Sequence, residues 1–218
     1  WTPATTEAFA TYGVIDDGAI RQPVALPGSG AGGGTGGVVK QFGGLEVTTS
    51  STNLQALTDA MLYLVTYPFE CSEQRASRIL AIAALRDVLS AFAVAGMPSP
   101  AEMEARVAAD LERLENMQNS DGGFPIWERG RETWPFLTVH VVNALARAKA
   151  KGYPVDAEML DQAEGYLADI ESHYPHYYGE EVRRSISAYA LYVRKLVGKV
   201  DVPKARRLIS QAGGVDKL

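Results

Sequence analysis

Cysteine is nearly absent from this chain of 218 residues, in which Cys71 is the single example. One cysteine excludes a disulfide within the chain, so three interpretations of Cys71 remain: a small buried hydrophobic residue, a reactive thiol, or a thiol held in another kind of bond. Histidine is also scarce, with three residues, and no set of ligands has the spacing of a metal site. We therefore expect neither a metal nor a cofactor.

Positive charge and long apolar runs are lacking as well. The net charge is -5, without a local cluster of Lys and Arg, so a nucleic-acid partner is not expected. The longest strictly apolar run, ILAIAAL at 79–85, is too short to cross a membrane. No initiator methionine or leader accompanies Trp1, and we expect a segment of a longer protein whose targeting signal is not in view.

The first part of the chain differs in composition from the rest. Residues 28–37 read GSGAGGGTGG and are flanked by short pieces that favour extended backbone. This glycine-rich stretch lacks the lysine and the following helix of a phosphate-binding loop. We predict an irregular or β-type linker segment over 1–48 and a helical domain over 49–218.

Helical periodicity dominates after residue 50, where no strand pattern is found. Helices as long as those predicted in this part of the chain, when joined by short turns, pack as antiparallel hairpins. We therefore predict an all-α stack or ring of hairpins. The seven predicted helices lie at about 53–66, from Cys71 or Ser72, from Pro100, at 136–152, 156–171, 181–197 and 203–212.

The third of these helices has the clearest start. Ser99 is a suitable N-cap, Pro100 suits the first helical position, and Glu102 completes a capping box. Its expected buried stripe consists of Met103, Val107, Leu111 and Leu114.

Cys71 stands at the start of the second predicted helix, three residues before Gln74. Side chains at i and i+3 lie over one another on a helix, and free N–H groups with the helix dipole favour a thiolate there. Displacement of ammonia from Gln74 by this thiolate would give an internal thioester. The spacing permits this chemistry without demanding it. Two alternatives stay open: Cys71 is an inert buried residue, or it is a hydrolase nucleophile paired with His140, His173 or His176.

The stretch YPFECSEQ at 67–74 resembles the thioester motif of the alpha-2-macroglobulin and complement family. The family pattern C-x-E-Q falls on Cys71, Glu73 and Gln74, and the preceding Tyr67 and Pro68 resemble its bacterial branch. Similar stretches before and after the motif extend the resemblance over about 5–200. It implies an α/α toroid of helical hairpins, incomplete in this segment.

The same resemblance implies a protease trap that acts once and is not an enzyme. Gln74 would supply the acyl carbon and Cys71 the leaving thiolate when a surface lysine of the target protease attacks. Tyr67 and Phe69 would shield the bond from water, and Glu73 would position the glutamine or favour the helix start by its charge. Target proteases and other domains of the parent chain are the implied partners, in a periplasmic or envelope setting with a role in host defence.

Some relatives direct the thioester with a histidine, but none is assigned here. His140 is expected to be a packed or hydrogen-bonded core residue, and His173 and His176 to lie in a turn among tyrosines. Two other functions stay open: a helical interaction module with an inert cysteine, and a toroid enzyme such as a lyase or cyclase. The latter rests on QNSDGGF at 118–124, whose Asp121 to Gly123 are better explained as a turn with positive φ.

Overall fold

The computed structural model describes residues 13, 15, 17–21, 47, 54–89 and 98–215. The chain separates into two compact units, Trp1–Thr49 and Ser50–Leu218. The predicted extended segment, its glycine-rich stretch and the boundary near residue 48 fall almost entirely outside the described residues. They stay predictions.

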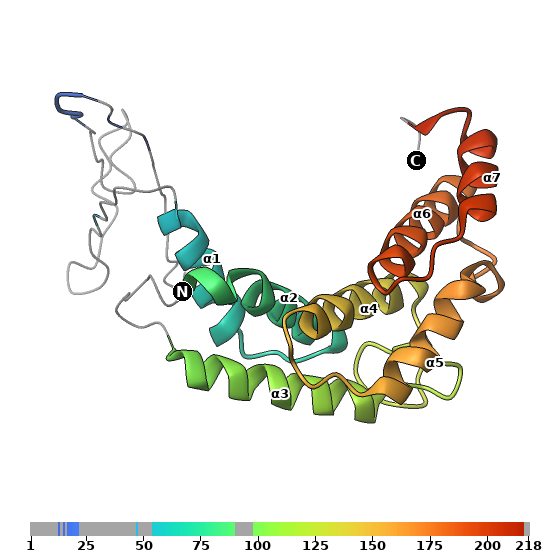
Figure 1. Ribbon diagram of the computed structural model, residues 1–218, viewed down its shortest axis with the longest axis horizontal. Coiled ribbons are helices and arrows are strands. Elements are labelled where there is room, and N and C mark those ends of the chain that lie inside the picture. Colours follow the sequence, from blue (N-terminus) through green and yellow to red (C-terminus); the bar gives the residue numbers. More distant parts are fainter. Residues whose placement is uncertain are drawn as a thin grey trace, which may run out of the picture. The chain divides into compact units, whose positions relative to one another are not determined.

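The regular elements among the described residues of the second unit are all helices, without a strand, which confirms the predicted all-α class (Figure 1). A short 3₁₀ helix, η1 (Ile170–His173), follows the fifth α-helix, so that helix ends earlier than predicted. The α-helices are α1 (Leu54–Thr66), α2 (Ser72–Leu89), α3 (Pro100–Met117), α4 (Pro135–Ala150), α5 (Ala157–Ala168), α6 (Glu180–Leu196) and α7 (Val202–Ala212).

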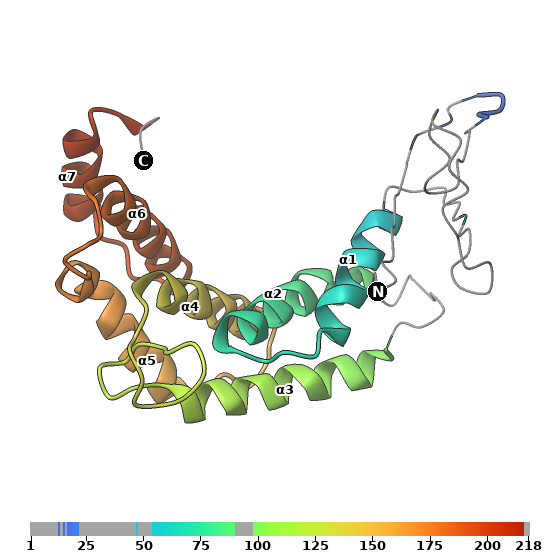
Figure 2. The ribbon, with the colours of Figure 1, turned by 180° about the vertical axis from the view of Figure 1, so that it is seen from behind.

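In this unit the even-numbered helices contact one another and the odd-numbered helices pack on them (Figures 1 and 2). Helices α2, α4 and α6 contact one another in succession, while α1 and α3 pack on α2, α5 packs on α4 and α6, and α7 packs on α6. Because α4 is covered on several sides it is apolar almost all round, with Val139, Val142 and Leu145 fully buried. This is the packing of helical hairpins, and closure into a toroid stays a prediction.

The start of α3 has the predicted capping box. The Ser99 hydroxyl accepts from the Glu102 backbone N–H at 3.3 Å, and the Glu102 carboxylate accepts from the Ser99 N–H at 2.7 Å. All four residues of the expected stripe are buried, namely Met103, Val107, Leu111 and Leu114. The local sequence pattern therefore predicted both the first turn and the buried face of this helix correctly.

The loop between α3 and α4 contains the predicted turn. Gly122 has φ 85°, and the Asp121 carboxylate accepts from the Gly123 N–H at 2.9 Å. A Cβ added to Gly122 would lie 2.3 Å from the backbone oxygen of Gln162 on α5. The loop is thus pressed against α5, and glycine is required there by both conformation and space.

Replacing Gly122 with alanine is expected to lower the free energy of unfolding by about 2–4 kcal/mol, because left-handed strain adds to overpacking against backbone. The matched control is Gly130→Ala, since Gly130 has φ 86° but no atom within 4 Å of an added Cβ. That variant should lose only about 1–2 kcal/mol. Urea unfolding of both variants measures the difference, and equal losses would show that the contact with α5 is not tight.

Candidate functional site

Cys71 and Gln74 come together at the mouth of α2. The Cys71 carbonyl accepts from the Arg75 N–H at 3.0 Å, which makes Cys71 the residue that caps the helix. Its side chain is buried at 6% exposure and its thiol is free of any disulfide. The Gln74 side chain folds back, and its Oε1 accepts from the Cys71 N–H at 3.0 Å. The carboxamide and the thiol-bearing residue are therefore held within one turn.

The next residue, Ser72, fastens the helix start to the loop between α3 and α4. Its N–H donates to the Ile126 carbonyl at 2.9 Å, and its hydroxyl donates to the Pro125 carbonyl at 2.7 Å. The same hydroxyl lies 3.8 Å from the sulfur of Met117. Because Ser72 is fully buried, these bonds fix the backbone beside Cys71 rather than leaving it to solvent.

A buried ion pair joins α2 to α3 one turn beyond the motif. Arg78 donates to both carboxylate oxygens of Asp110 at 2.7 Å, and Arg75 donates to one of them at 2.7 Å. Arg78 and Asp110 are each 1% exposed. The two-pronged geometry is the strong form of an arginine–carboxylate contact, and both partners depend on it because neither charge is in contact with water.

The two arginines also hold Glu70, the residue before Cys71. Its carboxylate accepts from Arg75 at 2.7 Å and from Arg78 at 3.3 Å, and its carbonyl accepts from the Arg75 side chain at 3.1 Å. Burial pushes the pKa of Glu70 upward, but the two guanidinium groups outweigh it and the pKa is lowered. Asp110 is thus linked through both arginines to the Glu70 side chain, and through Arg75 to the backbone carbonyl that precedes Cys71.

Glu73 contacts α4 through a short polar cluster. Its Oε1 accepts from the Ser77 hydroxyl at 2.7 Å, and Ser77 is hydrogen-bonded to His140 Nε2 at 3.0 Å. His140 Nε2 lies 3.9 Å from the same Glu73 oxygen. His140 is therefore a hydrogen-bonded, largely buried residue, as predicted, but its contact with the motif glutamate was not foreseen.

Stability should fall as the pH is lowered from 7.5 to 5.5, partly because of His140. Burial lowers the pKa of His140 below its ordinary value, and Glu73 opposes part of that change. Below a pH near 6.5 the unfolded chain then binds a proton that the folded chain does not, so folding stability is lost until the lower folded pKa is reached.

The measurement is urea unfolding of the parent chain and of His140→Gln at both pH values. The variant cannot titrate at this position, so its loss of stability between pH 7.5 and 5.5 should be smaller. An unchanged pH dependence would show that His140 has the same pKa in the folded and unfolded chain.

The aromatic residues before the motif form a cluster beside it. Tyr67 lies 5.3 Å from Tyr63 and 5.6 Å from Phe69 between ring centroids. Phe69 is 59% exposed, whereas Tyr67 is half-buried. Sequence reasoning missed Tyr63, which the helical period places one turn before Tyr67. Shielding of the thioester by Tyr67 and Phe69 stays a prediction.

The other two histidines lie elsewhere. His173 ends η1 and His176 follows in the turn before α6, as expected among tyrosines. Within the described residues, neither these two nor His140 is hydrogen-bonded to Cys71. In the same part of the chain, no three His, Cys, Asp or Glu side chains are arranged to hold a metal ion. No described helix has the length and apolarity needed to span a membrane.

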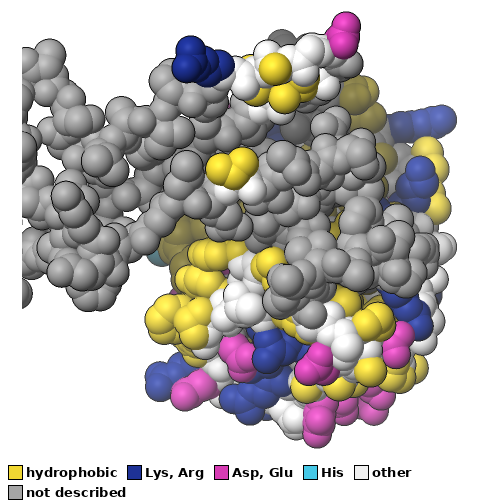
Figure 3. Space-filling view, turned by 90° about the vertical axis from the view of Figure 1, so that its left-hand side faces the viewer, with side chains coloured by type: hydrophobic (Ala, Val, Ile, Leu, Met, Phe, Trp, Pro, Cys, Tyr) yellow, Lys and Arg dark blue, Asp and Glu magenta, His cyan; other side chains and the backbone are white. Residues whose placement is uncertain are grey.

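One face of the molecule is seen in Figure 3, where the described side chains of both charge signs lie interspersed with hydrophobic ones. Independently of this view, Arg86 of α2 and Glu104 of α3 form an ion pair with 3.0 Å between nitrogen and oxygen.

Comparison with known proteins points to one family, although no family profile matches the chain. An alpha-2-macroglobulin of Xylella fastidiosa is 28% identical over 154 residues, which cover 68% of this chain and 9% of that protein. An Escherichia coli alpha-2-macroglobulin is 31% identical over 100 residues, covering 45% and 6%. The chain belongs to the bacterial alpha-2-macroglobulin family.

Solved alpha-2-macroglobulins share this fold. The E. coli protein from its MG7 domain to the C-terminus matches with a TM-score of 0.63 at 23% identity, covering 72% of this chain and 26% of that one. The Salmonella protein matches with a TM-score of 0.62 at 24% identity, covering 72% and 11%. At these identities the likeness concerns the fold.

A further relative carries a different name. The Circularly permutated Ras protein 2 of Dictyostelium discoideum is 30% identical over 171 residues, which cover 74% of this chain and 4% of that protein. Because the match covers so little of that protein, its name says nothing about the matched stretch. In all these curated relatives, the chain spans less than a tenth of their length.

Proposed function

We propose that this chain is the thioester-containing domain of a bacterial alpha-2-macroglobulin that traps proteases covalently. The observation that carries the proposal is the Gln74 carboxamide folded back onto Cys71 at the buried mouth of α2, with 3.0 Å between Oε1 and the Cys71 nitrogen. Both residues lie at the start of α2, and this contact holds the Gln74 side chain against Cys71, which is the proximity that the reaction needs.

The bond forms when the Cys71 sulfur attacks the Gln74 carboxamide carbon. A carbon–sulfur bond replaces the carbon–nitrogen bond, and the nitrogen leaves as ammonia with the thiol proton. A lysine amine of a protease later attacks the same carbon, so that an amide forms and the Cys71 thiol is regained. The acyl group is consumed, and each chain acts once without turnover. Glu73, which Ser77 and His140 hold from the other side, either positions the neighbouring Gln74 or favours the helix start by its charge.

Relatives support this chemistry. The Salmonella protein of the same fold was solved after reaction with methylamine, a small amine nucleophile. An E. coli alpha-2-macroglobulin of the same fold was solved in a trypsin-activated form. For this chain, target proteases as covalent partners through lysine, other domains of the parent protein as shields, a periplasmic or envelope setting and a role in host defence all belong to the proposal.

The test is the intact mass of the chain before and after methylamine, together with thiol titration in denaturant. A thioester gives a mass one ammonia below that of the sequence and no free thiol, and methylamine restores the thiol while adding its own mass. A full-mass chain with a free thiol from the start contradicts an intact bond. It would favour a helical interaction module with an inert cysteine.

A further inference from the structure

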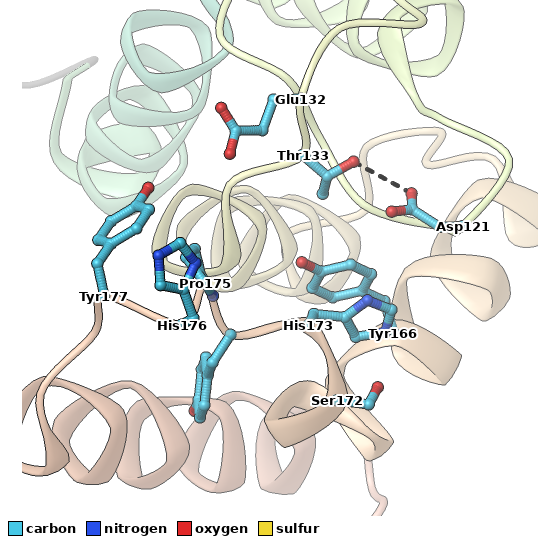
Figure 4. Close-up of a pocket in the computed structure, with 10 residues that line it drawn as sticks. Asp121, Glu132, Thr133, Tyr166, Ser172, His173, Pro175, His176 and Tyr177 are labelled. Atoms are coloured by element: carbon cyan, nitrogen blue, oxygen red, sulfur yellow. Dashed lines mark hydrogen bonds between the residues drawn. The ribbon is translucent and has the colours of Figure 1, made fainter.

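A cavity of about 470 Å³ lies away from the motif contacts, between the loop that joins α3 to α4 and the turn that follows η1 (Figure 4). The loop contributes Asp121, Glu132 and Thr133, the end of η1 contributes His173, and the turn contributes His176. A volume of this size is in the range of small-ligand sites and is larger than a single side chain. Nothing in the thioester chemistry uses it.

Aromatic rings form much of the wall. Tyr166 and His173 are stacked with ring centroids 3.8 Å apart and planes 18° from parallel. On the other side, His176 and Tyr177 meet edge to face at 5.5 Å, and Tyr177 is 60% exposed. Figure 4 shows rings from both pairs bordering the cavity. Of the two tyrosines Tyr177 is the exposed one, and the face of an exposed aromatic ring attracts a cation.

The charged groups at the rim are acidic. Asp121 and Glu132 line the cavity, whereas no Lys or Arg does. Among the described residues, neither carboxylate has an ion-pair partner, and Glu132 has no hydrogen bond. Asp121 accepts from Gly123 and Thr133 through one oxygen, which leaves the second available. Two unpaired carboxylates beside aromatic faces make a site that favours a cation.

The loop wall is preformed. The Asn119 side chain donates to the Arg131 carbonyl and to Thr133 at 2.8 Å, and accepts from the Gly130 N–H at 2.7 Å. A Cβ added to Gly123 would lie 2.1 Å from the Thr133 methyl group, so this part of the loop is closely packed. A wall fixed in this way does not have to order when a ligand binds, which favours affinity.

We propose that this cavity binds an arginine side chain of a polypeptide. A guanidinium group is planar, stacks on aromatic rings and donates two parallel hydrogen bonds to a carboxylate, whereas an ammonium group is a compact, strongly hydrated charge. The remaining volume accommodates the backbone beside the arginine. The site goes beyond the thioester chemistry, since binding there requires neither Cys71 nor Gln74.

The test is binding of N-acetyl-arginine N-methylamide to the methylamine-treated chain. Binding is measured from the change in the NMR chemical shifts of His173 and His176 as the probe is added. This probe has no amine to be acylated, so a missing thioester does not affect the result. The lysine analogue should bind more weakly, and the citrulline analogue, which has the same shape without the charge, should not saturate. Equal binding of arginine and citrulline would overturn the proposal.

Two variants test whether the arginine binds at the carboxylates of this cavity. Glu132→Gln and Asp121→Asn should each weaken binding by about three- to tenfold, as expected for the loss of one partly exposed charge pair. Asn at 121 keeps the oxygen that accepts from Gly123, so the turn is preserved. Glu128→Gln is the matched control, because Glu128 is an exposed residue of the same loop that does not line the cavity. If Glu128→Gln had the same effect as the other two, the arginine would be attracted by overall charge and not bound in the cavity.

Discussion

Replacing Asp110 with alanine is expected to lower the free energy of unfolding by about 3–5 kcal/mol. The reason is that Arg78, which is 1% exposed, would keep its charge in the interior with no carboxylate from α3 beside it. Arg75 would lose its contact with α3 as well. Urea unfolding followed by circular dichroism gives the free energies of the parent and the variant.

Glu104→Ala is the matched control for this variant. Glu104 lies on the same helix as Asp110 and pairs with another arginine of α2, Arg86, but both partners of that pair are exposed to water. An exposed pair contributes about 0–1 kcal/mol, so this variant should unfold almost as the parent does. Similar losses for the two variants would mean that burial of Arg78 and Asp110 is not what makes their pair important.

Asp110→Ala should also reduce formation of the thioester between Cys71 and Gln74. Asp110 holds the two arginines that grip Glu70, and Glu70 directly precedes Cys71. When that grip is lost, the backbone at Cys71 is freer, and the thiol spends less time against the Gln74 carboxamide. The fraction of chains that carry the thioester, measured by intact mass at a temperature where the variant is folded, should therefore decrease.

The helices could be predicted from the sequence because their signals are local. The capping box of Ser99 and Glu102 is contained within four residues, and the spacing of Met103, Val107, Leu111 and Leu114 sets the buried face of α3. The Gly122 turn is local in the same sense. Such features need no knowledge of what lies across the core.

The remainder of the site could not be predicted, because it depends on packing between helices. Asp110 looks like one more polar residue of α3, and only the approach of α2 shows that it faces Arg78. The contact of His140 with Ser77 spans 63 residues and depends on how α2 packs on α4. The cavity at Asp121 and His173 joins a loop to a turn that are far apart in the chain. The sequence offered two hints, the pair Arg75 and Arg78 at i and i+3 and the place of Asp110 three residues after Val107 on the predicted buried stripe.

Cys71→Ser and Gln74→Glu are each expected to abolish covalent incorporation of a labelled amine, from up to one amine per chain to none. The two variants remove different halves of the bond. Serine lacks the thiolate that acts as the leaving group, and a glutamate carboxylate is not attacked by a thiol. Gln74→Glu should in addition leave a free Cys71 thiol that reacts with Ellman's reagent in denaturant, whereas Cys71→Ser leaves no thiol at all.

Unfolding would also prevent labelling, so a destabilised chain with an intact motif is needed beside these variants. Val65→Ala serves this purpose, because Val65 is buried at 2% exposure on α1 and its truncation leaves a small cavity in the core. It should lose stability and still incorporate the amine. If Gln74→Glu were labelled like the parent, the acyl group would come from another side chain, and the bond between Cys71 and Gln74 would have to be abandoned. Loss of label in both motif variants with label retained in Val65→Ala assigns the acyl transfer to this one pair of side chains.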